Sequence, residues 1–154
     1  MFGGNVVVIA GHFDMTTTTI DVGTEMPPLL RTVQQRQIDA YAQASGDHNP
    51  VHLDPSFAKS VGLPGTIAHG LLDMGILADA VARFAGGNQY VLCLSCRFSK
   101  PLLPGDTLIC EGRVTAIENG VATLEVSAKS DNGNRVLTSG NARIALHATR
   151  SADT

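Results

Sequence analysis

Residues 69–84 read H-G-L-L-D-M-G-I-L-A-D-A-V-A-R-F and are apolar on almost every side of a helix. Such a segment is typical of a buried helix, because a surface helix carries its apolar residues on one face only. Gly70, Gly75, Ala78 and Ala82 are small and permit a close approach of neighbouring backbone. The segment therefore predicts a long central helix that packs against another layer of structure.

Strand-like segments follow this helix, which is expected to end at the pair Gly86 and Gly87. The turn sequences P-L-L-P-G-D, E-N-G and S-D-N-G-N separate them. In the third strand, apolar and polar residues alternate as they do in a half-buried strand. One buried helix along a curled, mainly antiparallel sheet is an α+β arrangement. The four predicted strands are residues 90–98, 107–117, 121–129 and 135–146.

Shorter elements are expected before the central helix. Pro27 and Pro28 begin a predicted extended segment that ends near residue 33. Residues 34–45 have the apolar spacing of a helix with one buried face, and Thr32 is a candidate N-cap for it. Pro55 can occupy a first helical turn, so residues 56–61 are predicted as a short helix.

Residues 41–52, Y-A-Q-A-S-G-D-H-N-P-V-H, place a carboxyl group, Asp47, and an imidazole, His52, five positions apart. Two titratable groups on one rigid turn are what general acid–base catalysis requires. Gly46 tolerates unusual φ angles, Asn49 can bond its own backbone, and Pro50 fixes φ. We interpret this turn as catalytic, with Asp47 and His52 acting as a pair.

Structural alternatives exist for the same residues. Asp47 and Asn49 could serve only to hold the turn, and His52 could be a structural histidine. A metal site formed by His48, His52 and the nearby carboxyl groups of Asp47 and Asp54 is disfavoured. Ligation by H-x-x-x-H relies on helical geometry, and Pro50 interrupts the spacing. We therefore expect no metal ligands here.

Three motifs together resemble a known family. They are the turn sequence of residues 41–52, A-H-G-L-L-D-M-G at 68–75, and R-F-S-K-P-L-L-P-G-D-T-L at 97–108. This pattern resembles the MaoC-like (R)-specific enoyl-CoA hydratases and 3-hydroxyacyl thioester dehydratases, which have a hot-dog fold. The resemblance covers most of the chain, from about residue 22 to residue 146. It implies reversible hydration of trans-2-enoyl thioesters, carried by CoA or acyl-carrier protein, without a cofactor.

The resemblance also assigns roles to residues. Asp47 and His52 match the catalytic acid and base. Independently of the resemblance, Asn49 and His69 are candidate substrate contacts, although Asn49 could only hold the turn and His69 could only cap or pack. Gly70 stands at the expected start of the central helix, where N–H groups are unpaired and the helix dipole is positive. Its N–H would bind the thioester oxygen, although Gly70 could also serve close packing. The alternatives are a non-catalytic acyl-binding subunit of a hetero-oligomer and a thioesterase on the same fold.

Composition narrows the class of partner. The chain has 154 residues, 44% hydrophobic and 16% charged, with a formal net charge of −3. This size fits one domain, and the charge argues against nucleic acid or an anionic membrane as a partner. No segment is long and apolar enough to span a membrane, and no signal peptide is recognised, so a cytoplasmic location is expected. Three cysteines, Cys93, Cys96 and Cys110, are predicted to be buried structural thiols.

We predict three segments: a peripheral or flexible N-terminal segment (1–19), a MaoC-like hot-dog domain (20–147) and a flexible C-terminal tail (148–154). A lone sheet has an exposed edge, so we expect a homodimer or higher homo-oligomer. Asp73 and Asp79 lie in the buried helix, where each needs a partner or a role. Asp73 could face the active site, and either could lie at a dimer interface or pair with Arg83. Arg97, Lys100 and Arg113 are candidate phosphate contacts or ordinary strand ends.

Overall fold

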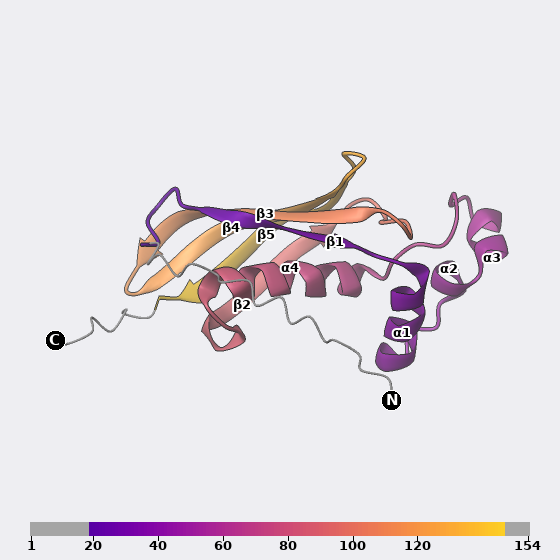
Figure 1. Ribbon diagram of the computed structural model, residues 1–154, viewed down its shortest axis with the longest axis horizontal. Helices are drawn as coiled ribbons and strands as arrows, with labels where there is room; N and C mark the ends of the chain where they lie inside the picture. Colours follow the sequence, from indigo (N-terminus) through magenta and orange to yellow (C-terminus); the bar gives the residue numbers. More distant parts are fainter. Residues whose placement is uncertain (1–18, 147–154) are drawn as a thin grey trace, which may run out of the picture.

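The computed structural model describes residues 19–146, which form one antiparallel sheet with a long helix, α4, lying along it (Figure 1). The sheet has five strands in the order β1-β3-β4-β5-β2. This arrangement confirms the predicted α+β hot-dog architecture. The predicted C-terminal tail and nearly all of the predicted N-terminal segment lie outside the described residues. The elements are β1 (Glu25–Thr32), α1 (Gln35–Ser45), α2 (Pro50–Leu53), α3 (Pro55–Ser60), α4 (Gly70–Ala85), η1 (Asn88–Tyr90), β2 (Val91–Phe98), β3 (Thr107–Glu118), β4 (Val121–Ser130) and β5 (Arg135–Ala145).

Helix α4 packs one face against the sheet. Leu77, Val81 and Ala85 on that face are buried in the core, and the helix ends at Gly86 with φ of 85°. The predicted buried helix is thus confirmed on this face, and within residues 19–146 the opposite face is only partly covered. Leu71 is 63% exposed, and Gly75 has no neighbouring atoms where a Cβ would stand. The reason is geometric: a single sheet covers only one side of a helix.

The strand predictions after α4 are confirmed to within one residue at each end. In β4, the apolar set of alternating residues faces the core, and every member is buried: Ala122, Leu124, Val126 and Ala128. Strand β1 begins earlier than expected, at Glu25, and includes both prolines. Its register with β3 shifts between Met26 and Leu29, and β1 is an edge strand. Proline has no N–H to donate, and it is tolerated at an edge or a bulge because no neighbouring strand requires that N–H there.

Helix α1 does not use Thr32 as its N-cap. The N-cap is Gln34, whose N–H donates to Oε1 of Gln37 at 2.8 Å. The Thr32 hydroxyl instead forms a hydrogen bond with the hydroxyl of Thr107 at 2.7 Å. The extended segment therefore continues to Thr32, which ties the edge strand to β3.

Helices α1, α2 and α3 lie together beside the N-terminal end of α4 (Figure 1). The short helix α2 was not predicted. It forms because Asn49 caps it and Pro50 occupies its first position, where a missing N–H has no consequence. Asp54 then caps α3 by accepting hydrogen bonds from the N–H groups of Ser56 and Phe57. These caps fix the position of His52 near the N-terminal end of α4.

The cysteines only partly match the prediction of buried thiols. Cys110 is buried and Cys96 is half-buried, but Cys93 is exposed. Cys93 lies on β2, which is an edge strand of the sheet formed by residues 19–146. Burial raises the pKa of the Cys110 thiol to about 12, so this thiol is unreactive.

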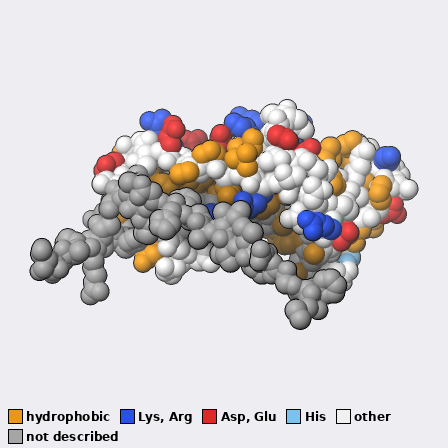
Figure 2. Space-filling view, viewed as in Figure 1, with side chains coloured by type: hydrophobic (Ala, Val, Ile, Leu, Met, Phe, Trp, Pro, Cys, Tyr) orange, Lys and Arg blue, Asp and Glu red, His pale blue; other side chains and the backbone are white. Residues whose placement is uncertain are grey.

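The described surface in Figure 2 carries basic, acidic and hydrophobic side chains in mixed groups. Among residues 19–146, no helix combines the length and the apolar character needed to cross a bilayer.

Candidate active site

The turn between α1 and α2 is held by its own side chains. Gly46 ends α1 with φ of 78°, a left-handed conformation that glycine adopts without strain. The Asp47 carboxylate accepts a hydrogen bond from the N–H of Asn49 at 3.2 Å. Oδ1 of Asn49 accepts from the N–H of Val51, also at 3.2 Å. The Asn49 side chain thus caps α2, and Asp47 is left exposed at the rim of a pocket.

His52 is buried and its ring orientation is set by one hydrogen bond. Its Nδ1 lies 2.8 Å from the carbonyl oxygen of Ile67. A carbonyl oxygen only accepts, so Nδ1 carries a hydrogen, and in a neutral imidazole ring Nε2 is then the nitrogen with the lone pair. Nε2 lies 3.9 Å from Oδ2 of Asp47. This gap is too long for a direct hydrogen bond but leaves both atoms within reach of one water molecule.

His69 contacts both members of this pair. Its ring stacks on His52 with centroids 3.8 Å apart and contacts the ring of Tyr41 at 4.8 Å. Its Nε2 lies 3.0 Å from the backbone oxygen of Asp47, to which it donates. Its Nδ1 is buried and finds no hydrogen-bond partner in the described part of the chain. The geometry gives His69 a positioning role for the turn, with its ring forming part of a pocket wall.

Gly70 is the first residue of α4, so its N–H has no acceptor within the helix. A Cβ at this position would lie 2.9 Å from Cδ1 of Phe98, so the absence of a side chain lets the aromatic ring pack on the backbone. Both readings of Gly70, anion binding and close packing, are therefore compatible with its position. Gly70 and Phe98 border two pockets, one of about 460 Å³ that includes Asp47 and one of about 300 Å³ that includes His52.

The two pockets are also lined by residues that the sequence analysis had not assigned to the site. Tyr41 and Phe98 form parts of the pocket walls, and Lys100, left open as a phosphate contact, lines the smaller pocket. The motif R-F-S-K-P was the available signal for Phe98 and Lys100, but a strand sequence does not show which side chain reaches a helix. Arg113 lies elsewhere, in a pocket with Glu25 on the β1–β3 side of the molecule.

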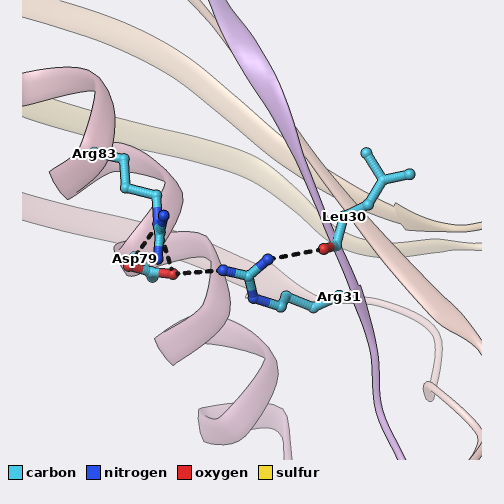
Figure 3. A network of polar contacts seen from close by, with 4 residues as sticks. All are labelled: Leu30, Arg31, Asp79 and Arg83. Atoms are coloured by element: carbon cyan, nitrogen blue, oxygen red, sulfur yellow. Dashed lines mark hydrogen bonds and ion pairs between the residues drawn. The ribbon is translucent and has the colours of Figure 1, made fainter. Parts of the chain in front are cut away.

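Asp73 also lines the smaller pocket, with a side chain that is almost completely buried. Burial raises the pKa of its carboxyl group to about 7. Asp79 has a different environment: it pairs with Arg83 at 3.0 Å and with Arg31 of β1 at 3.4 Å (Figure 3). Of the two carboxyl groups in α4, Asp79 thus forms the expected ion pair and Asp73 faces the site.

A metal ion is poorly matched to these side chains. Ligand atoms of Asp47, His52 and His69 lie within 4.8 Å of one another. However, the two imidazole rings are stacked, with an interplanar angle of 27°. The lone pair of an imidazole nitrogen lies in the plane of its ring, so stacked rings direct their lone pairs along similar directions and not towards one ion. The arrangement fits proton transfer better than metal binding.

Comparisons with known proteins identify the family of this chain. A profile of the family described as "MaoC like domain" matches residues 17–134. Enoyl-CoA hydratase 2 of Arabidopsis thaliana is 44% identical over 69 residues, which cover 44% of this chain and 22% of that protein. 3-Hydroxyacyl-thioester dehydratase X of Mycobacterium tuberculosis is 40% identical over 78 residues, which cover 50% of this chain and 26% of that protein.

The structural likeness is more complete. The (R)-hydratase from A. caviae involved in PHA biosynthesis superposes with a TM-score of 0.76 and 28% identity, over 84% of this chain and 99% of that one. By contrast, the matches span between 5% and 28% of the first four curated relatives. The profile match, these relatives and the shared fold lead to one conclusion: the chain belongs to the MaoC-like dehydratase family.

Proposed function

We propose that the protein catalyses the (R)-specific hydration of trans-2-enoyl thioesters and the reverse dehydration of (R)-3-hydroxyacyl thioesters. The observation that carries this proposal is the geometry of His52 and Asp47. A lone pair on Nε2 and a carboxylate oxygen stand 3.9 Å apart, beside the N-terminus of α4. In this proposal His52 acts as the base, Asp47 as the acid and the N–H of Gly70 as the group that binds the negative charge.

In the proposed reaction, water lies between Asp47 and His52. His52 Nε2 accepts a proton from the water as its oxygen bonds to C3 of the substrate. The N–H of Gly70 stabilises the negative charge that develops on the thioester oxygen. The proton then passes from His52 to the Asp47 carboxylate, which delivers it to C2, and both side chains return to their starting state. Each step uses only groups of the protein and the reacting water, so the proposed reaction requires no metal or redox cofactor.

Loss of the enoyl-thioester absorbance with crotonyl-CoA and with a longer trans-2-enoyl-CoA tests the proposal. The wild-type protein should consume the enoyl group, release no free thiol and form the (R)-3-hydroxyacyl product, as chiral analysis would show. Release of thiol would instead indicate a thioesterase, in which water attacks the carbonyl carbon.

A folded protein with no activity on either CoA substrate would be assayed next with enoyl groups on acyl-carrier protein. Failure there too would refute the proposed activity for this chain alone. It would favour a non-catalytic acyl-binding subunit, which should still bind acyl-CoA.

We also propose that the protein is a homodimer in which two sheets join edge to edge. Strand β2 is an edge of the sheet and carries exposed Leu92 and Phe98. The adjacent part of α4 carries exposed Leu71. Large apolar side chains at an open sheet edge are typical of an interaction surface.

A further inference from the structure

Asp73 has no role in the proposed proton transfers, yet it lines the same pocket of about 300 Å³ as His52 and Gly70. Its exposed fraction is 2%. Oδ1 is buried and has no hydrogen-bond partner within residues 19–146. A buried polar atom without a partner is costly, and native proteins keep few of them. A bound ligand that forms a hydrogen bond with Oδ1 of Asp73 would therefore remove this cost.

The surroundings of Asp73 are mostly apolar. His52 and Lys100 are the titratable groups that share the pocket with it, and Cys110 of β3 is close enough to interact electrostatically. Burial raises the pKa of the carboxyl group to about 7, so the group carries its proton below neutral pH. A protonated carboxyl group both donates and accepts hydrogen bonds. The apolar residues that line the pocket are Leu63, Ile67, Ala68, Phe98, Pro101 and Val136.

We propose that Asp73 is a specificity-determining residue that forms hydrogen bonds with an oxygen substituent on the acyl chain of the substrate. The preferred substrates are then hydroxyacyl or oxoacyl thioesters, with the oxygen placed beyond the reacting carbons. This inference rests on the proposed function, which puts the thioester carbonyl at the N–H of Gly70 and C3 beside His52. A plain hydrocarbon chain would bury the Asp73 carboxyl group without a partner and bind less tightly.

The helix sets the position of that oxygen. Asp73 follows Gly70 by three residues, and a rise of about 1.5 Å per residue places it about 4.5 Å further along the axis of α4. The two residues lie on the same side of the helix. An acyl chain that starts at Gly70 and runs along α4 would bring C4 to C6 past the Asp73 carboxyl group.

Binding of saturated acyl-CoA esters, measured by isothermal titration calorimetry, tests the inference without any turnover. The ligands are hexanoyl-CoA, 5-oxohexanoyl-CoA and 6-hydroxyhexanoyl-CoA. Wild-type protein should bind at least one oxygenated ester about ten-fold more tightly than hexanoyl-CoA. Asp73→Leu should reverse this preference, because leucine fills similar space without hydrogen bonding. Asp73→Asn, which keeps a donor and an acceptor, should retain it.

Asp79→Asn is the matched control, since it changes a carboxyl group of the same helix that lies outside this pocket, and its selectivity should equal that of the wild type. Equal affinities of the wild-type protein for all three esters would overturn the inference, as would an unchanged preference in Asp73→Leu. Hydration of crotonyl-CoA by the wild-type protein tests the proposed function separately. Selective binding without hydration would reject the hydratase activity and keep the role of Asp73.

Discussion

A single hydrogen bond determines which nitrogen of His52 faces the pocket. The carbonyl of Ile67 holds Nδ1 in its protonated form, and this leaves Nε2 as the basic atom on the side of Asp47. His69 fixes the other half of the pair by binding the backbone oxygen of Asp47. The acid and the base are thus each oriented by a hydrogen bond to a neighbouring residue.

Substitution of either member of the pair should remove activity while the fold remains. His52→Gln and Asp47→Asn are each expected to lower kcat by a factor of about 10² to 10⁴, the usual contribution of a positioned acid or base. Steady-state hydration of crotonyl-CoA gives kcat, and circular dichroism reports the fold. His48→Gln, an exposed histidine of the same turn, is the control and should keep wild-type kcat. A comparable loss in His48→Gln would show that the turn itself had been disturbed.

Asp73 should make the stability of the protein depend on pH. Its pKa is raised by burial from 3.8 to about 7, so between these values the folded state holds a proton that the unfolded state has lost. Stability from this group is therefore present at low pH and is lost as pH rises towards 7, with a slope of about 1.4 kcal/mol per pH unit. Urea denaturation at pH 5 and pH 8 should show that wild type loses more stability than Asp73→Asn. Parallel losses in the two proteins would contradict the prediction.

At the scale of elements, the site depends on where two helices end and begin. Helix α1 ends at Gly46, immediately before Asp47, and α4 begins at Gly70, immediately after His69. A residue at a helix terminus has a defined direction because the cap determines the backbone path. The ion pair of Asp79 with Arg31 also connects α4 to the edge strand β1, while its pair with Arg83 lies within α4 (Figure 3). These residues are partly exposed, so their contribution to stability is small.

Gly46→Ala should test the coupling between helix end and catalysis. The φ of 78° is left-handed, and a Cβ there would meet nothing within 4 Å, so strain is the main cost. We expect a loss of about 1–2 kcal/mol in the free energy of unfolding and a lower kcat, because Asp47 follows directly. Gly133→Ala has a similar φ of 87° and similar free space, but lies in the turn between β4 and β5. It should lose comparable stability in urea denaturation and keep its kcat.

At the scale of the whole molecule, the two edges of the sheet differ. The β1 edge contains two prolines and a register shift, which hinder pairing with another strand. The β2 edge is free of proline and carries exposed apolar side chains. This asymmetry makes β2 the better candidate for pairing with a second copy.

Leu92→Lys should therefore weaken the proposed dimer, because it places a charge on the β2 edge where an apolar side chain is 51% exposed. Size-exclusion chromatography with light scattering, over a range of protein concentrations, should show twice the chain mass for wild type and a shift towards the monomer for the variant. Leu30→Lys makes the same change on β1, where leucine is 54% exposed, and should stay dimeric. A monomeric wild-type protein would reject the dimer outright.

The sequence by itself determined the helix α4, the four strands that follow it and the turn that carries Asp47 and His52. These features follow from local physics, since apolar spacing, glycine and proline act over a few residues. The same reasoning misplaced the cap of α1, because the Thr32 hydroxyl forms a hydrogen bond with Thr107 instead. It also misplaced the start of β1, because an edge strand can include prolines. The short helix α2 was missed for a related reason: its cap depends on how the Asn49 side chain is used.

The remaining features of the site and of α4 depend on the tertiary structure alone. Contacts between residues far apart in the chain set the Nδ1 hydrogen bond of His52, the stacking of His69 and the packing of Phe98 on Gly70. The burial of Asp73 beside His52, and the open side of α4, likewise depend on which elements surround them. Local periodicity carries no information on such contacts, because they arise when the sheet closes over one side of the helix and leaves the other side free.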